Sequence, residues 1–164
     1  MKIILPLLFI LIVSCSSMKS DNGVYEKSTS YKNSFVKSPP RNWKKINNEG
    51  SDFALESTLN GNIFIINSAC RKYVTSNLPN LTQSILSGID NLDIIKEEII
   101  HYQDRDAVLL KAKGSIDGVT RFFKLLTLQK NSCIYDFILI ANTLNTLEQH
   151  EKDFDTFING IQVN

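Results

Sequence analysis

AVLLKAKGSIDGVTRFFKLLTLQKNSCIYDFILIA, residues 107–141, is the stretch of sequence that decides the fold. Near its start, Val108, Leu110 and Ala112 point to one face and the lysines between and after them point to the other. This alternation indicates a half-buried strand. The last run, 133–141, carries Asp136 as its one charged residue, which is typical of a strand in the middle of a sheet.

Two polar pairs divide this stretch into strands. Asp117-Gly118 is a favoured two-residue hairpin turn, because both residues tolerate a positive φ. A second turn follows at Asn131-Ser132, after the returning run 120–129. The stretch therefore predicts an antiparallel meander.

More strands are predicted before the meander. Residues 52–58 (DFALEST) alternate in hydropathy, Asn60-Gly61 is a second hairpin signal, and 62–70 (NIFIINSAC) reads as the returning strand. The run 94–102 (IIKEEIIHY) has apolar pairs that are compatible with a helix, but its many β-branched residues favour a strand.

One amphipathic helix is predicted between these strands. Apolar residues recur at helical spacing after Thr75, with Ser76 or Asn77 as the cap and Pro79 in the first turn. Gly88 is placed to end this helix.

A second helix is predicted over residues 145–161, with its apolar residues on one face. Asn145 and Glu148 have the spacing of a capping box. The element order β-β-α-β-β-β-β-α, joined mostly by hairpins, predicts an α+β domain: an antiparallel sheet of about six strands with helices packed on it.

The first residues have the pattern of an export signal. Lys2 is followed by an apolar run, 3–13, which as a helix is about 16 Å long and too short to span a bilayer of about 30 Å. The run ends Ile12-Val13-Ser14-Cys15, which resembles the lipobox of bacterial lipoproteins. The resemblance implies cleavage before Cys15 and acylation of its thiol. The alternative is a conventional signal peptide whose apolar run ends near a cysteine.

These features predict three segments. Residues 1–14 are a lipoprotein signal peptide, 15–42 are the lipidated cysteine with a flexible tether, and 43–164 are a single domain whose first packed residue is Trp43. The acylated Cys15 would hold the protein on a lipid bilayer. Ser16 stands where inner-membrane lipoproteins carry aspartate, so the resemblance implies the outer membrane, facing the periplasm.

The charge of the chain argues against a nucleic-acid partner. Cleavage would remove Lys2 and leave 17 basic and 17 acidic residues, without the basic excess of a phosphate-binding surface.

Residues of the domain are similar to a known fold family. The tryptophan before the first strand, the NG hairpin, the helix after NSAC, the DG meander and a closing F-x-x-F helix resemble the PsbP/Mog1-like α/β/α sandwich over residues 43–162. The resemblance implies an accessory binding protein without catalysis, and it transfers no functional residue.

Cys70 and Cys133 are a candidate disulfide, because exported proteins oxidise their cysteines and both residues lie at ends of predicted strands. The alternative is two buried thiols. Together with His101 and His150 they could supply four zinc ligands, but their spacing matches no zinc motif, and we predict no metal and no cofactor.

Asp136 is the candidate ligand contact, because a charge in so apolar a strand needs a partner or a wet face. The alternative is that Asp136 pairs within the fold, at a sheet edge or with a helix cap. His150 falls on the apolar face of the last helix and His101 at the end of a strand, with no nucleophile motif in the sequence. The acidic turn at Asp104 and Asp106 reads as solvated, and we predict no catalytic residue and no enzyme.

The sequence thus predicts a membrane-anchored bacterial lipoprotein that binds another envelope protein without catalysis. The alternative is a carrier that holds an apolar small molecule or acyl chain between sheet and helix.

Overall fold

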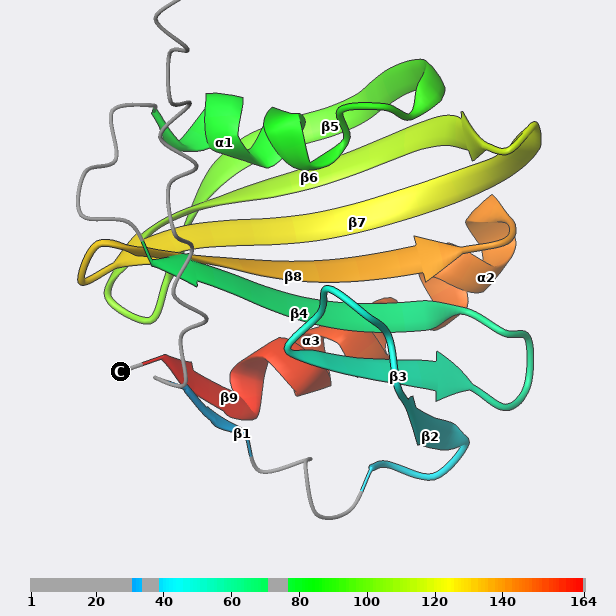
Figure 1. Cartoon of the computed structure of the whole chain (residues 1–164), viewed down its shortest axis with the longest axis horizontal. Coiled ribbons are helices and arrows are strands. Elements are labelled where there is room, and N and C mark those ends of the chain that lie inside the picture. Colours follow the sequence, from blue (N-terminus) through cyan, green and yellow to red (C-terminus); the bar gives the residue numbers. More distant parts are fainter. Residues whose placement is uncertain (1–30, 34–38, 71–76, 164) are drawn as a thin grey trace, which may run out of the picture.

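The computed structural model describes residues 31–33, 39–70 and 77–163. Its main sheet is antiparallel and has seven strands in the order β2-β3-β4-β8-β7-β6-β5 (Figure 1). The strands are β2 (Trp43–Ile46), β3 (Phe53–Ser57), β4 (Ile63–Cys70), β5 (Asp90–Tyr102), β6 (Arg105–Ile116), β7 (Val119–Lys130) and β8 (Cys133–Ala141). The helices are α1 (Leu78–Ile85), α2 (Leu144–Gln149) and α3 (Glu151–Asn159). The α+β prediction is confirmed.

The predicted meander is present as β6, β7 and β8. Both residues of Asp117-Gly118 and both residues of Asn131-Ser132 have positive φ, so each pair forms a tight turn between its strands. Strand β8 lies between β4 and β7, which confirms its central position. Strand β5 begins earlier than predicted, at Asp90, and forms one edge of the sheet.

The sheet of about six strands that the sequence predicted has seven. The additional strand is β2 (WKKI), which pairs with β3 although it is too short to show a pattern. One prediction about the turns was wrong: Asn60-Gly61 does not form a two-residue turn, since only Gly61 has a positive φ. The connection instead spans residues 58–62 and closes with a bond from the Ser57 amide to the Asn62 carbonyl.

Helix α1 begins as predicted, since the Asn77 side chain accepts the Asn80 amide and Pro79 lies in the first turn. It ends at Ile85, before Gly88, which has a φ of +91°. The helix predicted over 145–161 is two helices that meet at His150. The predicted cap at Asn145 was wrong: Thr143 caps α2, in a reciprocal arrangement with the Thr146 side chain.

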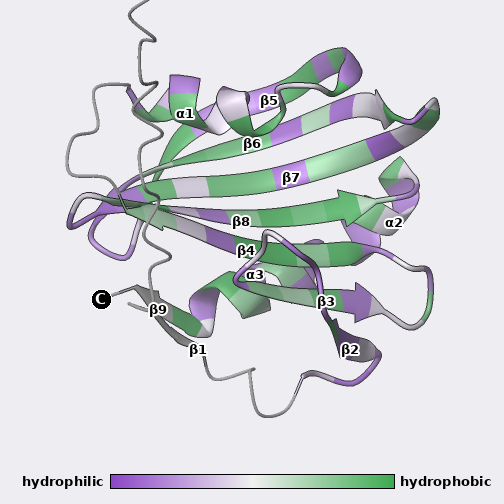
Figure 2. Cartoon of the chain, viewed as in Figure 1, coloured by the Kyte–Doolittle hydropathy of each residue, from purple (hydrophilic) through white to green (hydrophobic). Residues whose placement is uncertain are grey.

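Helices lie on both faces of the sheet. In Figure 1, α1 lies in front of the sheet and α3 behind it. The larger core joins the sheet to α2 and α3 and contains Tyr135, Phe137, Phe154 and Phe157, all buried. The smaller core lies on the α1 face and contains Leu86, Leu110, Leu125 and Ile138. Figure 2 shows apolar residues along the central strands and polar residues at the turns.

A small second sheet lies near the carboxyl end, where β1 (Tyr31–Asn33) pairs antiparallel with β9 (Ile161–Val163). Residues 31–33 belong to the segment predicted as a tether, so this part of it forms a strand against the domain. The signal-peptide and lipidation predictions fall on residues 1–30, which lie outside the described residues.

Candidate functional site

A polar row crosses the middle of the sheet on the face that carries α1. Asn67 on β4 lies directly opposite Asp136 on β8, and Asp136 lies directly opposite Thr127 on β7. Directly opposed residues share a face, with Cβ atoms about 4.5–5.5 Å apart. The register therefore brings the predicted residue Asp136 together with two polar residues from neighbouring strands.

Most residues on either side of this polar row are apolar. On one side Ile65, Ile138 and Leu125 oppose one another, and on the other side Ala69 opposes Ile134, which in turn opposes the exposed Gln129. Ile138 and Leu125 belong to the core beneath α1, which places the polar row on that face. Thr127 is fully buried, and Asn67 and Asp136 are partly exposed.

Each member of the row has a buried oxygen atom without a hydrogen-bond partner: Asn67 Oδ1, Thr127 Oγ1 and Asp136 Oδ1. Thr127 is 0% exposed. Burial raises the pKa of Asp136 from 3.8 to about 7, and the neighbouring Thr127 hydroxyl offsets part of that rise. Among the described residues Asp136 forms no ion pair and caps no helix, and its neighbour in the fold is Thr127.

Cys70 and Cys133 lie opposite each other at the ends of β4 and β8, and the structure joins them by a disulfide. The bond links two strands that are 63 residues apart in sequence. It lies on the side of the larger core, to which Cys133 belongs, and therefore on the opposite face from the polar row.

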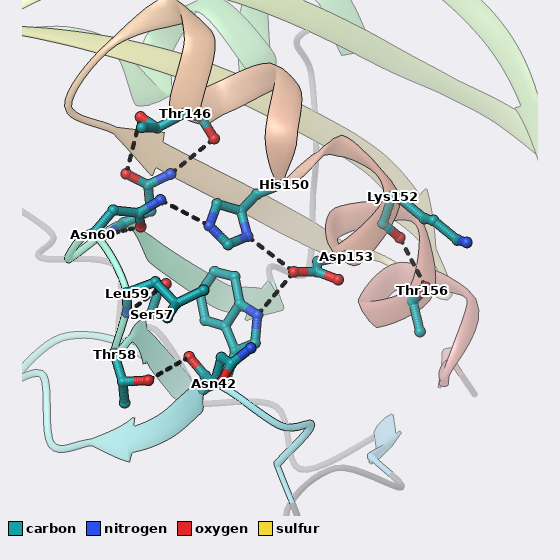
Figure 3. Close-up of polar contacts among 12 residues, drawn as sticks. Asn42, Ser57, Thr58, Leu59, Asn60, Thr146, His150, Lys152, Asp153 and Thr156 are labelled. Atoms are coloured by element: carbon teal, nitrogen blue, oxygen red, sulfur yellow. Dashed lines mark hydrogen bonds and ion pairs between the residues drawn. The ribbon is translucent and has the colours of Figure 1, made fainter.

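His150 belongs to a second polar group, at the junction of α2 and α3 (Figure 3). Its Nε2 lies 2.9 Å from Asn60 Nδ2, and its Nδ1 lies 2.9 Å from Asp153 Oδ2. Asn60 Oδ1 accepts the Asn62 amide, so the Asn60 NH₂ group faces the ring and donates to Nε2. The proton of the neutral ring is therefore on Nδ1 and is donated to Asp153.

Asp153 joins this group to β2, because its Oδ2 also accepts the Trp43 indole N–H at 3.0 Å. The Trp43 ring packs edge-on against His150, with centroids 5.0 Å apart. Both nitrogens of His150 are thus engaged in holding β2 and the 58–62 loop against the two helices. The arrangement is that of a structural histidine, as the sequence indicated for the apolar face of this helix.

The remaining candidate residues do not join either group. His101 is exposed at the end of β5 and pairs with Asp106 on β6 in register. Asp104 and Asp106 are exposed around the β5–β6 turn, and Arg105 donates to the Gln129 carbonyl instead of to either aspartate. In the part of the chain that the structure describes, no three His, Cys, Asp or Glu side chains are grouped to hold a metal ion.

Several residues were not found from the sequence. Asn67 and Thr127 belong to no recognisable sequence motif. The register of the strands places them beside Asp136. Lys124, 4% exposed, is a buried cation on the opposite face that lies 3.3 Å from Asp155 and above the Phe154 ring. A lysine in a strand ordinarily indicates the face of the sheet that is exposed to solvent. The alternation of residues in the sequence therefore did not predict that Lys124 is buried.

Comparisons with known proteins support the fold. No family model matches the sequence, and no curated protein is similar to it. Solved structures are similar: the cyanobacterial PsbP protein (CyanoP) of Synechocystis matches with 13% identity and a TM-score of 0.56, covering 93% of this chain and 99% of that one. The chain therefore has a PsbP-like fold, as its sequence resemblance predicted.

Two further structures share this fold. LpqN of Mycobacterium tuberculosis, described as involved in cell envelope biogenesis, matches with 12% identity and a TM-score of 0.53, covering 89% of this chain and 87% of that one. A protein of unknown function from Pseudomonas aeruginosa matches with 13% identity and a TM-score of 0.52, covering 80% of this chain and 79% of that one. None of these three descriptions names an enzyme.

None of the described helices has the length and apolar character needed to cross a membrane.

Proposed function

We propose that this protein is a membrane-anchored lipoprotein that binds another envelope protein, without catalysis, through the free edge of β5. The anchor is Cys15, on the strength of its lipobox. The similarity in fold to LpqN, whose description places it in envelope biogenesis, supports an envelope role. The observation that carries the binding proposal is the character of β5.

Strand β5 is the outermost strand of the sheet on one side, and among the described strands β6 alone pairs with it. It carries exposed large apolar side chains: Leu92, Ile94, Ile95 and Ile99. Ile99 is 66% exposed and Ile95 is 50% exposed. A long edge strand with apolar side chains is a ready template for pairing with a strand from another chain.

The charges of β5 indicate the chemistry of the partner. Within Asp90–Tyr102 the acidic residues are Asp90, Asp93, Glu97 and Glu98, and the basic residue is Lys96, which forms an ion pair with Glu98. The edge is therefore acidic as well as apolar. We infer that the partner supplies an extended segment in which apolar residues alternate with basic ones.

Photo-crosslinking in the native membrane tests this proposal. A photoreactive amino acid at Ile99 should give one crosslinked product of constant mass, and at Leu59 it should give none. Leu59 is a matched control, because it is 69% exposed and lies in the loop at the other side of the sheet. Equal labelling from both positions, or repeated recovery of the uncrosslinked monomer alone, would reject partner binding at β5.

A carrier function is the second candidate, and one observation favours it. On the α1 face, Ile63, Ile65 and Ile140 of β4 and β8 are only partly buried, while α1 packs chiefly against β6 and β7. An apolar ligand could cover these isoleucines. Native mass spectrometry of protein purified from its own membranes tests this, since a carrier retains a ligand of defined mass and a consistently empty protein excludes the function.

A further inference from the structure

We propose that Asn67, Thr127 and Asp136 form a binding site for a primary alkylammonium group. The proposal concerns the α1 face of the sheet and does not depend on partner binding at β5. It is carried by three buried side-chain oxygen atoms, on directly opposed residues of one row, that have no close hydrogen-bond partner among the described residues.

The polar row lowers the stability of the fold as it stands. A buried polar atom without a partner is destabilising, and buried polar atoms in native proteins are nearly always paired. Asn67 Oδ1, Thr127 Oγ1 and Asp136 Oδ1 are three such atoms on directly opposed residues. Aliphatic residues at these positions would continue the row of Ile65, Ile138 and Leu125 beside them without this cost.

A primary ammonium group can donate a hydrogen bond to each oxygen of the row. It has three N–H donors and no acceptor, and a carboxylate, an amide oxygen and a hydroxyl oxygen can each accept one of them. Its positive charge also compensates the buried carboxylate, which lacks any cation in this row or in the rows 65–138–125 and 69–134 beside it. A neutral hydroxyl ligand would provide one donor and leave the charge unpaired.

A metal ion fits the row less well. Calcium takes six to eight oxygen ligands and magnesium requires a near-octahedral set, usually with more than one charged group. The row offers one carboxylate, one amide oxygen and one hydroxyl. No larger group of metal-binding side chains occurs in the described parts of the chain.

The apolar rows indicate what carries the ammonium group. Ile65 and Ile138 lie on one side of the polar row and Ile134 on the other, within reach of the first carbons of an alkyl chain. Ile65 is partly exposed, so the apolar surface continues outward from the polar row. The site therefore fits an aliphatic amine or a lysine side chain, in which the ammonium group ends a flexible hydrocarbon.

Protonation gives the site a pH dependence. Burial raises the pKa of Asp136 to about 7, so the empty site keeps its proton at mildly acidic pH and must lose it to bind a cation. The elements packed around Asp136 contribute no other titratable group to the row: β4 supplies Asn67, β7 supplies Thr127, and α1 (LPNLTQSI) has no ionisable side chain. Affinity should therefore rise about tenfold between pH 6 and pH 8.

The test uses the full lipidated chain in uncharged phosphatidylcholine nanodiscs with labelled isoleucine methyl groups. Titration with n-butylammonium at pH 8 should shift the methyl signals of Ile65, Ile134 and Ile138 saturably. Those of Ile158 and Ile161, buried in the core on the opposite face, are internal references. Butyltrimethylammonium has the same charge and chain but no N–H donor, and it should bind at least tenfold more weakly.

Variants separate the site from general binding of amines. Asp136→Asn removes the charge with little change in size and should weaken binding at least tenfold. Asp104→Asn, at an exposed position of the β5–β6 turn, is the matched control and should bind as the natural chain does. Should Asp136→Asn fail to fold, Thr127→Val, which removes one acceptor and keeps the shape, should weaken binding by about fivefold.

The source of the ammonium group is settled by carbodiimide treatment of membranes. An amide between Asp136 and a lysine, found by peptide mapping, identifies a lysine side chain as the occupant. Without that amide, saturable binding of n-butylammonium identifies a site for a free amine. The proposal is overturned if neither is found, if the quaternary probe binds equally well, or if Asp136→Asn has no effect, since water alone would then fill the row.

Discussion

Thr127 lies directly opposite Asp136 in the pairing of β7 with β8, and each residue keeps a buried oxygen atom without a hydrogen-bond partner. Neighbouring strands thus place two polar groups together in an apolar layer at a cost in stability. Native proteins retain such costs chiefly where a function depends on them.

Thr127→Val should therefore stabilise the empty protein. The substitution keeps the shape of the side chain and removes a fully buried hydroxyl that makes no close hydrogen bond. We expect a gain of about 1 kcal/mol at acidic pH, where Asp136 is protonated and the hydroxyl has no carboxylate charge to stabilise. For a chain of this size the melting temperature should rise by about 2–4 °C. Thr127→Ser keeps the hydroxyl and should give no gain. A loss of stability in Thr127→Val but not in Thr127→Ser would show that the Thr127 hydroxyl has a hydrogen-bond partner in the folded protein.

Asp136 should make stability fall as the pH rises. The folded state holds the proton of Asp136 up to a pH of about 7, whereas the unfolded chain releases it above 3.8. The unfolded state therefore binds fewer protons between these values, and the free energy of unfolding decreases from pH 4 to pH 7 by roughly 4 kcal/mol at most.

Chemical denaturation of the natural chain and of Asp136→Asn across pH 4–8 measures this effect. The stability difference between the two chains should change with pH in that window and be constant above it. Asp93→Asn serves as the control for loss of one carboxylate. Parallel pH profiles for the natural chain and Asp136→Asn would contradict the raised pKa.

The Cys70–Cys133 disulfide should be present in protein taken from the cell envelope, and its loss should be costly. Closure of a loop of 63 residues corresponds to about 4 kcal/mol in the chain-entropy model. The double variant Cys70→Ala/Cys133→Ala should unfold at markedly lower denaturant concentration. Peptide mapping without reductant should recover the linked peptides, and free alkylation of both cysteines would refute the bridge.

The group formed by Trp43, His150 and Asp153 should behave as a structural clamp. Trp43→Phe keeps an aromatic ring and removes the indole N–H that Asp153 accepts, so we expect a loss of about 1–2 kcal/mol. Lys152→Ala, on the exposed side of α3, is the control. Hydrogen exchange should show faster opening of β2 in the tryptophan variant, and unchanged exchange there would contradict the clamp.

Much of the fold was predictable because its signals are local. Asp117-Gly118 and Asn131-Ser132 form turns because these residues themselves tolerate a positive φ. The alternation of apolar and polar residues around Val108 is also local, because successive residues of a strand face opposite sides of the sheet. Strand β2 was missed because four residues show no period. The contact of His150 with Asn60, at the junction of α2 and α3, was missed because the two residues are distant in sequence.

The candidate site was predictable only in part, for the same reason. Asp136 stood out as a charge within an apolar run, which is a local signal. Asn67 and Thr127 have ordinary surroundings in the sequence, and their role arises from a register between strands that the sequence does not state.

The anchor at Cys15 implies export, and both the oxidised cysteines and the proposed envelope partner require it. Intact-mass measurement of the native protein, with and without the signal-peptidase inhibitor globomycin, tests it most directly. We predict a chain that begins at a Cys15 carrying acyl chains, and accumulation of the uncleaved form with the inhibitor. A native protein that still begins at Met1, or that carries a free thiol at Cys15, would contradict the account.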